Sequence, residues 1–481
     1  MSNLTDLLPA GAGGKQISFV ASGTIGNGVT VGLNSDGTVT AVASVSQATG
    51  SPVLFEAAAT DNIATSFDSS NNKVVVAYRD VGNSNYGTVV VGTVSGTSIS
   101  FGSAVVFNSG ATNDNSVTFD SSNNKIVIAY RDGGNSNYGT AIVGTVSGTS
   151  ISFGSESVFN AVYSAHVAIT FDSISNKVVV VYQDSGNSNY GTAVVGTISG
   201  TSISFGSESV FKSSNSKDMT IVFDSNSNKV VISFKDDGNS SYGTSVVGTV
   251  SGTSISFGSA VVFNSGATQD SSSAFDSSQN KIVVTYQNGS NANKGTAIVG
   301  TVSGTSISFG TAVIFAATRA DDTSVVFDSN ANKIVIAYQD GGNSKYGTVI
   351  VGTVSNTSIS FDSPVVFEAA ESAFIAATFD STSNKVFIAY RDVGNSNYGT
   401  AIIFQNASAN SADFIGISDA AISDTASGSV TIKGGISTNV TGLTPNSTYY
   451  VQSDGSLSTT ASDVLAGKAL SSTSINLDYT T

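Results

Sequence analysis

Residues 92–102 read GTVSGTSISFG, and this stretch decides the architecture because the chain repeats it. Identical copies stand at three later places: residues 144–154, 248–258 and 300–310. Near-copies, GTISGTSISFG and GTVSNTSISFD, stand at two more: residues 196–206 and 352–362. Neighbouring copies begin 52 residues apart, but residues 404–414, where a seventh is due, read FQNASANSADF.

A second marker has the same period. The pair Phe-Asp recurs seven times, with its phenylalanine at Phe67, Phe119, Phe171, Phe223, Phe275, Phe327 and Phe379. The sequence therefore contains seven units, which run from about Ser51 to about Gln405. A period of this size indicates a repeat architecture, in which a single unit does not bury its own faces.

Four strands are expected in each unit. In the unit that starts at Ser103 they read NSVTF, KIVIAY, YGTAIVGTV and SISFGSAVVF. The second strand is apolar on both faces, so we expect it to be covered on both sides. Seven such antiparallel units predict an all-β fold, a seven-bladed β-propeller. A β-solenoid would have a shorter period, and an immunoglobulin-like sandwich would need roughly 100 residues per unit.

The missing seventh copy is explained by the other end of the chain. Gly50 and Ser51 align with Gly102 and Ser103. The stretch TVTAVASVSQAT before Gly50 is therefore expected to form the outer strand of the last blade. Such a latch pairs the two ends of the ring and removes strand edges that invite aggregation.

The residues on either side of the repeats are expected to form one module. Residues 16–44 and 409–481 read as short strands, and both contain hairpins that turn on Asp-Gly, in NSDGTVT and QSDGSLST. A latched propeller brings its ends together, so we expect a small β-sandwich-like anchoring module with the propeller, residues 45–408, inserted into it. Two unrelated appendages are the alternative. Residues 1–15 are expected to be a flexible tail or docking arm.

The composition argues against several classes of function. A formal charge of −15 and a pI near 4.3 disfavour nucleic acid as a partner, because its phosphates need lysine and arginine. The absence of cysteine excludes disulfides, thiol nucleophiles and thiolate metal sites. The N-terminal residues lack the basic region of a secretory signal, and no apolar run is long enough for membrane insertion.

No catalytic site is predicted. His166 is the only histidine, and neither a Ser-His-Asp triad nor a metal site with several histidines is expected around it. Arg79, Arg131 and Arg391 share one repeat position, which invites comparison with the arginine cluster of sialidases. The other units carry Gln183, Lys235, Gln287 and Gln339 there, which favours a tolerant surface position. The chain has no tryptophan for the Asp-box of sialidases, so we expect a protein that is not an enzyme.

Two residues of most units are candidates for ligand binding on one propeller face. The first begins the third strand: Tyr86, Tyr138, Tyr190, Tyr242, Tyr346 and Tyr398. If exposed, these tyrosines would form a ring of platforms for sugars; if buried, they would pack between blades. The second opens the turn D-x-G-N-S-N-Y-G: Asp80, Asp132, Asp184, Asp236, Asp340 and Asp392. Unit five carries Asn288 and Lys294 at these two positions.

The turn aspartates have two interpretations. Their carboxylates and the neighbouring amides would suit Ca²⁺, which prefers oxygen ligands. Alternatively, the aspartate caps the turn through the backbone while the glycine takes a positive φ. The capping role is favoured, so no metal or other cofactor is predicted and Ca²⁺ is kept as the alternative.

One segment varies far more than the rest of the unit. Between VVF and the first inner strand, the units read EAAATDNIA, NSGATNDNS, NAVYSAHVA, KSSNSKDMT, NSGATQDSS, AATRADDTS and EAAESAFIA. One variable loop per blade on a uniform scaffold is how a binding face is built. Relaxed constraint on a surface loop is the alternative.

Two stretches resemble known proteins. The opening SNLTDLLPAGAGGKQISFVASGTIGNG and the ending FIGISDAAISDTASGSVTIKGG…GLTPNSTYYVQSDGSLSTTASDVLAGKAL are similar to the termini of virion structural proteins from tailed marine bacteriophages. The resemblance covers the flanks and implies a virion surface component of the tail-fibre, receptor-binding or capsid-decorating type. It implies contacts with other virion proteins through the module, and it supplies no catalytic residues.

These observations together predict a virion surface protein whose propeller contacts the host surface, with glycan as the ligand class. A purely structural decoration or fibre component is the first alternative. A polysaccharide-degrading enzyme is the second. The formation of a homo-oligomer is left open.

Overall fold

The computed structural model describes residues 15–34 and 36–477, which form two compact units. Residues 48–406 are one unit, and the described residues on either side of them are the other. The division lies a few residues from the predicted boundaries at 45 and 408. All but the last residue of the tail predicted for residues 1–15 lies outside the described residues.

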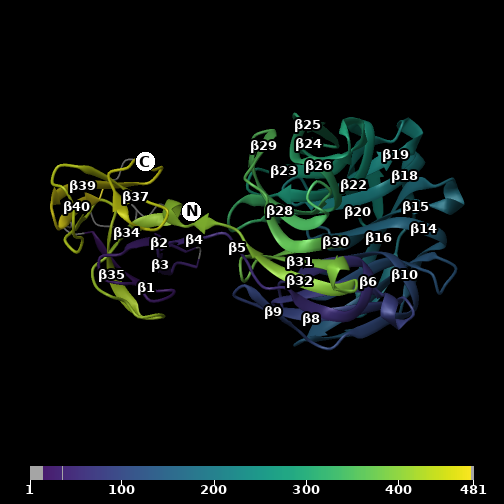
Figure 1. The fold of residues 1–481 in the computed structure, drawn as a ribbon, viewed down its shortest axis with the longest axis horizontal. Coiled ribbons are helices and arrows are strands. Elements are labelled where there is room, and N and C mark those ends of the chain that lie inside the picture. The colour runs from purple at the N-terminus through teal and green to yellow at the C-terminus, as the bar shows by residue number, and fades with distance from the viewer. Residues whose placement is uncertain (1–14, 35, 478–481) are drawn as a thin grey trace. The chain divides into compact units, whose positions relative to one another are not determined.

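The predicted all-β propeller is confirmed. Residues 48–406 form seven four-stranded antiparallel blades, whose strands hydrogen-bond in chain order. In Figure 1 the blades follow one another around a ring as the colour changes from purple to green. We number the blades 1 to 7 by their second strands: β7 Lys73–Asp80, β11 Lys125–Asp132, β15 Lys177–Asp184, β19 Lys229–Asp236, β23 Lys281–Asn288, β27 Lys333–Asp340 and β31 Lys385–Asp392.

The third and outer strands carry the repeated motif. The third strands are β8 Tyr86–Ser95, β12 Tyr138–Ser147, β16 Tyr190–Ser199, β20 Tyr242–Ser251, β24 Lys294–Ser303, β28 Tyr346–Ser355 and β32 Tyr398–Gln405. The short outer strands are β5 Ala48–Thr49, β9 Ser98–Phe101, β13 Ser150–Phe153, β17 Ser202–Phe205, β21 Ser254–Phe257, β25 Ser306–Phe309 and β29 Ser358–Phe361.

A 16-residue strand links each pair of neighbouring blades. Val105 of β10 pairs with Val89 of β8 in blade 1, while Phe119 of the same strand pairs with Ile126 of β11 in blade 2. The first part of each long strand continues the short outer strand of one blade, and its second part is the innermost strand of the next blade. These strands are β6 Val53–Asp68, β10 Val105–Asp120, β14 Ser157–Asp172, β18 Ser209–Asp224, β22 Val261–Asp276, β26 Val313–Asp328 and β30 Val365–Asp380.

The ring is closed by the N-terminal side of the chain, as the alignment of Gly50 with Gly102 predicts, but by a shorter segment than predicted. Of the stretch TVTAVASVSQAT only β5, Ala48–Thr49, joins blade 7, whereas β3, Val39–Ala41, pairs within the flanking module. Thr49 of β5 pairs with Phe404 of β32, and Val53 of β6 pairs with Ala401 of the same strand. Blade 7 therefore combines strands from both ends of the repeat region.

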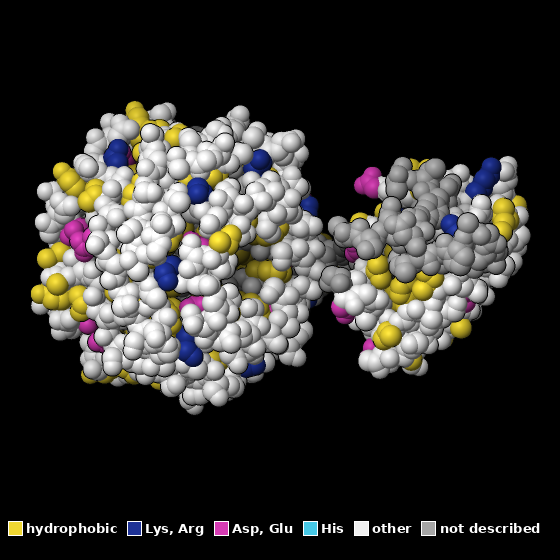
Figure 2. All heavy atoms as spheres, turned by 180° about the vertical axis from the view of Figure 1, so that it is seen from behind, with side chains coloured by type: hydrophobic (Ala, Val, Ile, Leu, Met, Phe, Trp, Pro, Cys, Tyr) yellow, Lys and Arg dark blue, Asp and Glu magenta, His cyan; other side chains and the backbone are white. Residues whose placement is uncertain are grey.

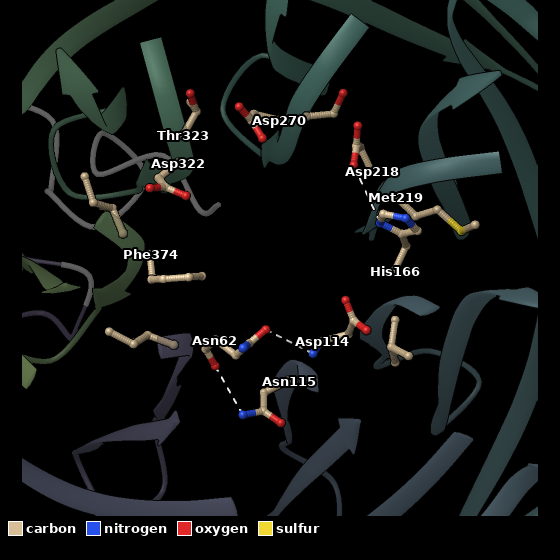
Figure 3. Close-up of a pocket in the computed structure, with 14 residues that line it drawn as sticks. Asn62, Asp114, Asn115, His166, Asp218, Met219, Asp270, Asp322, Thr323 and Phe374 are labelled. Carbon is tan, nitrogen blue, oxygen red and sulfur yellow. Dashed lines mark hydrogen bonds and ion pairs between the residues drawn. The ribbon is translucent and has the colours of Figure 1, made fainter. Parts of the chain in front are cut away.

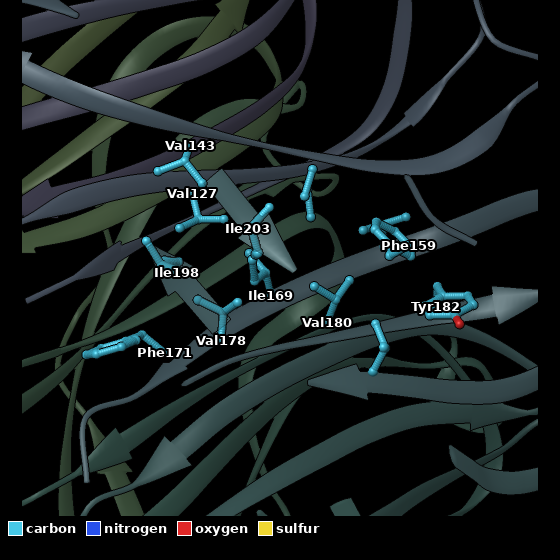
Figure 4. Close-up of a cluster of buried hydrophobic side chains, with 14 residues drawn as sticks. Val127, Val143, Phe159, Ile169, Phe171, Val178, Val180, Tyr182, Ile198 and Ile203 are labelled. Atoms are coloured by element: carbon cyan, nitrogen blue, oxygen red, sulfur yellow. The ribbon is translucent and has the colours of Figure 1, made fainter. Parts of the chain in front are cut away.

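Seven apolar clusters hold the ring together, one between each pair of neighbouring blades. Figure 4 shows the cluster in which Val127 and Val143 of blade 2 lie near Val178 and Val180 of blade 3. The second strands are buried on both faces, as predicted, so each contributes to two clusters. Burying one such aliphatic side chain contributes about 1.5–3 kcal/mol.

Glycines after the outer strands mark the places where blades come closest. A Cβ atom on Gly102 would lie 2.0 Å from the carbonyl oxygen of Thr149, in the turn after the third strand of the next blade. The same approach recurs at Gly50, Gly154, Gly206, Gly258 and Gly310. The seventh equivalent position is Asp362, whose neighbour is blade 7. Blade 7 has no such turn because β32 ends at Gln405, so a side chain is tolerated there.

The flanks form the predicted module with strands from both ends of the chain. One five-stranded sheet has the order β1-β35-β34-β2-β3, and the other has the order β36-β40-β39-β37-β38. A buried cluster contains Ile417 of the first sheet with Val451 and Leu477 of the second. The strands are β1 Gln16–Val20, β2 Thr30–Leu33, β3 Val39–Ala41, β34 Phe414–Ser418, β35 Ser427–Ile432, β36 Ile436–Ser437, β37 Thr448–Val451, β38 Leu457–Ser458, β39 Leu465–Ser471 and β40 Ser474–Leu477, with a separate pair of β4 Ser44–Val45 and β33 Ser408–Ala409.

The remaining elements are 3₁₀ turns: η2 Val81–Asn83, η3 Ser185–Asn187, η4 Asp237–Asn239, η5 Gly289–Asn291, η6 Val393–Asn395 and η7 Ser411–Asp413. Within the described residues no helix is long and apolar enough to cross a bilayer. Figure 2 shows one face of the molecule, where charged side chains are scattered and most of the surface is drawn in white or yellow, that is, without charged side chains. This agrees with a composition in which only 11% of residues are charged.

Candidate functional site

The innermost strand of each blade carries a β-bulge at the same place. In β6, Asn62 and Ile63 together lie opposite the single residue Tyr78, and the strand register shifts there. The same shift recurs in the other six blades. A bulge places an extra residue in one strand and changes the direction of its side chain.

The first bulge residue has a left-handed backbone in all seven blades. Its φ lies between 47° and 52° at Asn62, Asp114, His166, Asp218, Asp270, Asp322 and Phe374, which we call the bulge ring. This conformation costs a residue with a side chain about 1 kcal/mol, whereas glycine adopts it freely. Glycine occupies none of the seven positions. The side chains are therefore kept in spite of the strain.

The bulge ring lines a pocket of about 290 Å³ at the centre of the propeller. The labelled side chains in Figure 3 surround an open centre and come from different blades. Phe374 and Ile63, from neighbouring blades 7 and 1, put apolar side chains on one part of the wall, and Val167 and Met219 of blades 3 and 4 put others on another part. Asp218, Asp270 and Asp322, from blades 4 to 6, give it a carboxylate side.

Contacts between blades hold part of the ring in place. The backbone N–H of Asp114 donates to Asn62 Oδ1 over 3.2 Å, and Asn115 Nδ2 donates to the carbonyl oxygen of Asn62 over 3.2 Å (Figure 3). His166 Nδ1 lies 3.6 Å from Asp218 Oδ1.

A second cavity of about 450 Å³ adjoins the central pocket at blade 6. Both cavities are lined by Asp270 and Asp322. The remaining lining residues of the second cavity are Arg319, Asp321, Gln339, Gly341 and Lys345. Arg319 Nε donates to Asp321 over 2.7 Å, so this cation is partly neutralised. Together the two cavities offer room for a ligand larger than one sugar ring.

The carboxylate side of the pocket has an unusual electrostatic environment. Burial, and after it the nearby carboxylates of Asp322, Asp218 and Asp321, together raise the pKa of Asp270 to about 7. Burial also raises the pKa of Asp322. Carboxyl groups with strongly shifted pKa values in a pocket are typical of functional sites.

We expect Asp270 to make the stability of the propeller depend on pH. Its folded-state pKa of about 7 lies above the ordinary value of 3.8. Below pH 3.8 the carboxyl is neutral in both the folded and the unfolded chain, and its contribution to the free energy of unfolding is fully present. That contribution is lost as the pH rises through 7, because the folded chain must then hold a buried charge. Asp270→Asn should be more stable than the original protein at pH 8, on the order of a few kcal/mol, and the gain should shrink toward pH 4.

Thermal unfolding at several pH values between 4 and 8 tests this expectation. Asp362→Asn removes one exposed carboxylate outside the pocket and serves as the control. A stability gain for Asp270→Asn that stays the same at every pH would contradict the assignment.

The six predicted turn aspartates cap the turn between the second and third strands. Asp80 Oδ1 accepts the backbone N–H of Asn83 over 3.0 Å. Asp392 accepts the equivalent backbone N–H, that of Asn395. The other four accept the backbone N–H of the glycine two residues further on: Asp132, Asp184, Asp236 and Asp340. Burial raises the pKa of Asp80 and of Asp392. The favoured capping role thus describes their contacts, while a role in binding Ca²⁺ or another ligand stays a prediction.

The predicted conformation of this turn is wrong in one respect. The residues with positive φ are Ser84 and Asn85, at 58° and 63°, and not the glycine. Gly82 is required for packing instead, because a Cβ atom there would lie 2.4 Å from the Cβ of Ala58.

The six predicted tyrosines are neither fully exposed, as sugar platforms would be, nor fully buried between blades. Tyr86, Tyr138, Tyr190, Tyr242, Tyr346 and Tyr398 are all half-buried. Each pairs with the turn aspartate of its blade, as Tyr86 does with Asp80. None of the twelve predicted residues is among the described residues that line the central pocket. Their role as a ring of sugar platforms stays a prediction.

The position of the three arginines was wrongly predicted to be a tolerant surface position. Gln183, Gln287 and Gln339 occupy it in other blades and are 7%, 1% and 6% exposed. This repeat position pairs with the residue just before the bulge ring, as Arg79 does with Asp61. Its side chains contact residues of the innermost strands and do not gather into one cluster. Arg79 forms an ion pair with Asp61, and Arg391 lies 4.6 Å from the ring of Phe374.

The variable segment was predicted as a loop, but in every blade it is part of the 16-residue strand: β6, β10, β14, β18, β22, β26 or β30. The seventh residue of each quoted stretch is the bulge-ring residue, which reads Asn, Asp, His, Asp, Asp, Asp and Phe in order. The predicted diversity therefore lies at the central pocket. His166, for which no role was expected, is a member of this ring.

The chemistry of the pocket suits reversible binding of a polar ligand. Within residues 15–34 and 36–477, no group of three or more histidine, aspartate or glutamate side chains is arranged to hold a metal ion. The pocket offers carboxylate oxygens from blades 4 to 6, amide oxygens from Asn62 and Asn115 of blades 1 and 2, and the aromatic ring of Phe374 from blade 7. Polar side chains outnumber apolar ones in this lining, so the pocket is more polar than the usual small-molecule site.

No protein-family model and no curated protein matches the sequence. Solved structures do match the propeller. The BP39L lectin from Burkholderia pseudomallei aligns with a TM-score of 0.52 and 11% identity, over 74% of this chain and 98% of the lectin chain. A chain of the Mitotic Checkpoint Complex aligns with a TM-score of 0.50 and 9% identity, over 74% of this chain and 90% of its own. At these identities the likeness shows the β-propeller fold alone.

Proposed function

We propose that this protein is a binding protein without enzymatic activity, and that its propeller holds a glycan in the central pocket. The observation that carries the proposal is the bulge ring. Seven side chains of varied chemistry are held at equivalent positions by the same strained backbone, on a scaffold that hardly changes from blade to blade. A constant frame with variable contact residues is how repeat proteins build specific binding surfaces.

The pocket has the groups that a sugar needs. Ionised carboxylates and amide oxygens accept hydrogen bonds from hydroxyl groups, and Asn62, Asp218 and Asp322 supply them. The ring of Phe374 offers an apolar surface for the C–H groups of a sugar. One fold neighbour is itself a lectin, which supports the choice of glycan as ligand class.

The place of action is proposed from the flanks of the chain. Their resemblance to termini of bacteriophage virion proteins supports a position on the virion surface, where the module of both flanks would attach to other virion proteins. The glycan would then belong to the surface of the host cell. In this arrangement the propeller is displayed and the module anchors it.

A glycan panel with the purified full chain tests the binding function. Phe374→Ala should weaken binding to the best glycan at least tenfold, because the central aromatic contact is lost. Val366→Ala, which removes an exposed side chain on an outer strand, is the control and should bind normally. The proposal is contradicted if no glycan binds at millimolar concentration, or if Phe374→Ala binds as tightly as the original protein.

Gold-labelled antibody against residues 51–405, applied to purified phage particles, tests the place of action. Label at the tail or at fibre tips supports attachment to the host. Label spread over the head favours the alternative of capsid decoration. Absence of label from every particle contradicts the virion proposal. The proposed glycan binding is then judged from the glycan panel alone.

A further inference from the structure

The carboxylate side of the central pocket lacks the cations that another blade supplies. In blade 2 the ring residue Asp114 is neutralised by Arg131, whose Nε lies 2.9 Å from its Oδ2. The repeat position of Arg131 holds Gln287 in blade 5 and Gln339 in blade 6. A neutral residue therefore replaces the cation in two of the three blades that form the carboxylate side.

The positive charge near the three carboxylates comes from Arg319 and Arg391, which act on Asp322, and Arg319 is already paired with Asp321. Among the described residues, Asp270 and Asp322 form no ion pair. The amide of Gln287 approaches Asp270 Oδ2 only to 3.5 Å. Asp218, the third carboxylate, pairs with His166 alone, at 3.6 Å. A cation from outside the chain would restore the balance.

Hydrogen-bond acceptors on the same side are also unused. Ser271 Oγ and Thr323 Oγ1 line the pocket directly after Asp270 and Asp322 in the chain, and they have no partner among the described residues. Asn115 Oδ1, also in the lining, has none either. Buried polar groups without a partner are rare in native proteins. These oxygens are themselves enclosed, so a ligand donor would satisfy them only after the side chains turn toward the pocket.

We propose that the ligand presents a protonated primary amine to Asp218, Asp270 and Asp322, and is therefore an amino sugar. An ammonium group carries one positive charge and three hydrogen-bond donors, which matches both the carboxylates and the unused oxygens. A bare metal ion matches less well, because no described group of residues is arranged to hold one. This inference rests on the proposed glycan function and narrows it to one class of sugar.

The amine also changes the protonation of Asp270. The charged and titratable groups that face this carboxyl or share one of its two cavities are Asp114, His166, Asp218, Arg319, Asp321, Asp322 and Lys345. The carboxylates among them help to hold the pKa of Asp270 near 7. An ammonium group beside Asp270 lowers that pKa, so the protein releases a proton when the ligand binds at neutral pH.

Calorimetric titration of the full chain with two matched oligosaccharides tests the proposal. The glucosamine tetramer carries amines, and the N-acetylglucosamine tetramer has the same skeleton with the amines blocked. At pH 6.5 we expect the glucosamine tetramer to bind at least tenfold more tightly. Asp270→Asn and Asp322→Asn should each reduce this preference about tenfold, while Asp362→Asn should keep it. Titration in two buffers of different ionisation enthalpy should show proton release that Asp270→Asn lacks.

The outcomes separate this inference from the proposed function. Equal affinity for the two tetramers, or a preference that survives both pocket substitutions, overturns the amine. If neither tetramer binds but a neutral or acidic glycan of the panel does, the amine is wrong and the glycan function stands. If no glycan of any kind binds, both proposals fail.

Discussion

Replacement of Gly154 by alanine is expected to destabilise the propeller by about 3 kcal/mol. A Cβ atom at this position would lie 1.9 Å from the carbonyl oxygen of Thr201 and 2.9 Å from its carbonyl carbon. Both atoms belong to the backbone of the next blade, so the clash is relieved only if two blades move apart. Urea unfolding followed by circular dichroism measures the loss.

Asp362→Gly supplies a matched control at the seventh equivalent position. Because blade 7 has no turn to approach this residue, the substitution should change stability by no more than about 0.5 kcal/mol. The motif GTVSNTSISFD ends in aspartate, which we explain by the missing turn of blade 7. Equal shifts of the unfolding midpoint for Gly154→Ala and Asp362→Gly would contradict this explanation.

Tyr130→Ala is the second substitution with a large expected effect, a loss of about 4 kcal/mol. Tyr130 is fully buried, its ring lies 5.2 Å from that of Phe107, and its hydroxyl group donates to Glu156 over 2.9 Å. Burial raises the pKa of this hydroxyl, so it stays neutral. Alanine would leave a cavity between blades 1 and 2.

Tyr130→Phe distinguishes packing from hydrogen bonding at the same site. Blade 4 carries Phe234 at this repeat position, fully buried like the tyrosines, so the ring alone is compatible with the fold. We expect a loss of about 1 kcal/mol for the hydrogen bond. Unfolding midpoints that fall equally for the alanine and phenylalanine variants would show that the hydrogen bond, and not the ring, holds this interface.

The blades were predictable because local patterns determine them. A period of 52 residues, one two-sided apolar strand such as KIVIAY and turn residues between strands are each visible in the letters. The closure was predictable for the same reason, since Gly50 aligns with Gly102. These features depend on neighbours in the chain or on exact repetition, and both can be read without coordinates.

The bulge ring was not predictable because it depends on strand register. Nothing in the letters shows that Asn62 and Ile63 share one partner, and a shift of one residue turns every later side chain to the opposite face of the strand. The left-handed backbone at His166 and Phe374 has no sequence signature either. The one available signal is the variety of the nine-residue stretch that contains this position, and that stretch was predicted to be a loop.

The closure of blade 7 has a consequence for synthesis on the ribosome. Thr49 emerges early, but its partner Phe404 follows on the order of 350 residues later, which takes roughly 20–70 s at ordinary translation rates. During that time the first half of β6 has an unpaired edge, while blades 1 to 6 can already form from adjacent segments. The nascent chain is therefore an incomplete ring with an unpaired strand edge at each end. Prematurely terminated chains keep the edge of β6 exposed, where it can pair with other chains. Completion of the last strand is the step that turns an aggregation-prone intermediate into a closed ring.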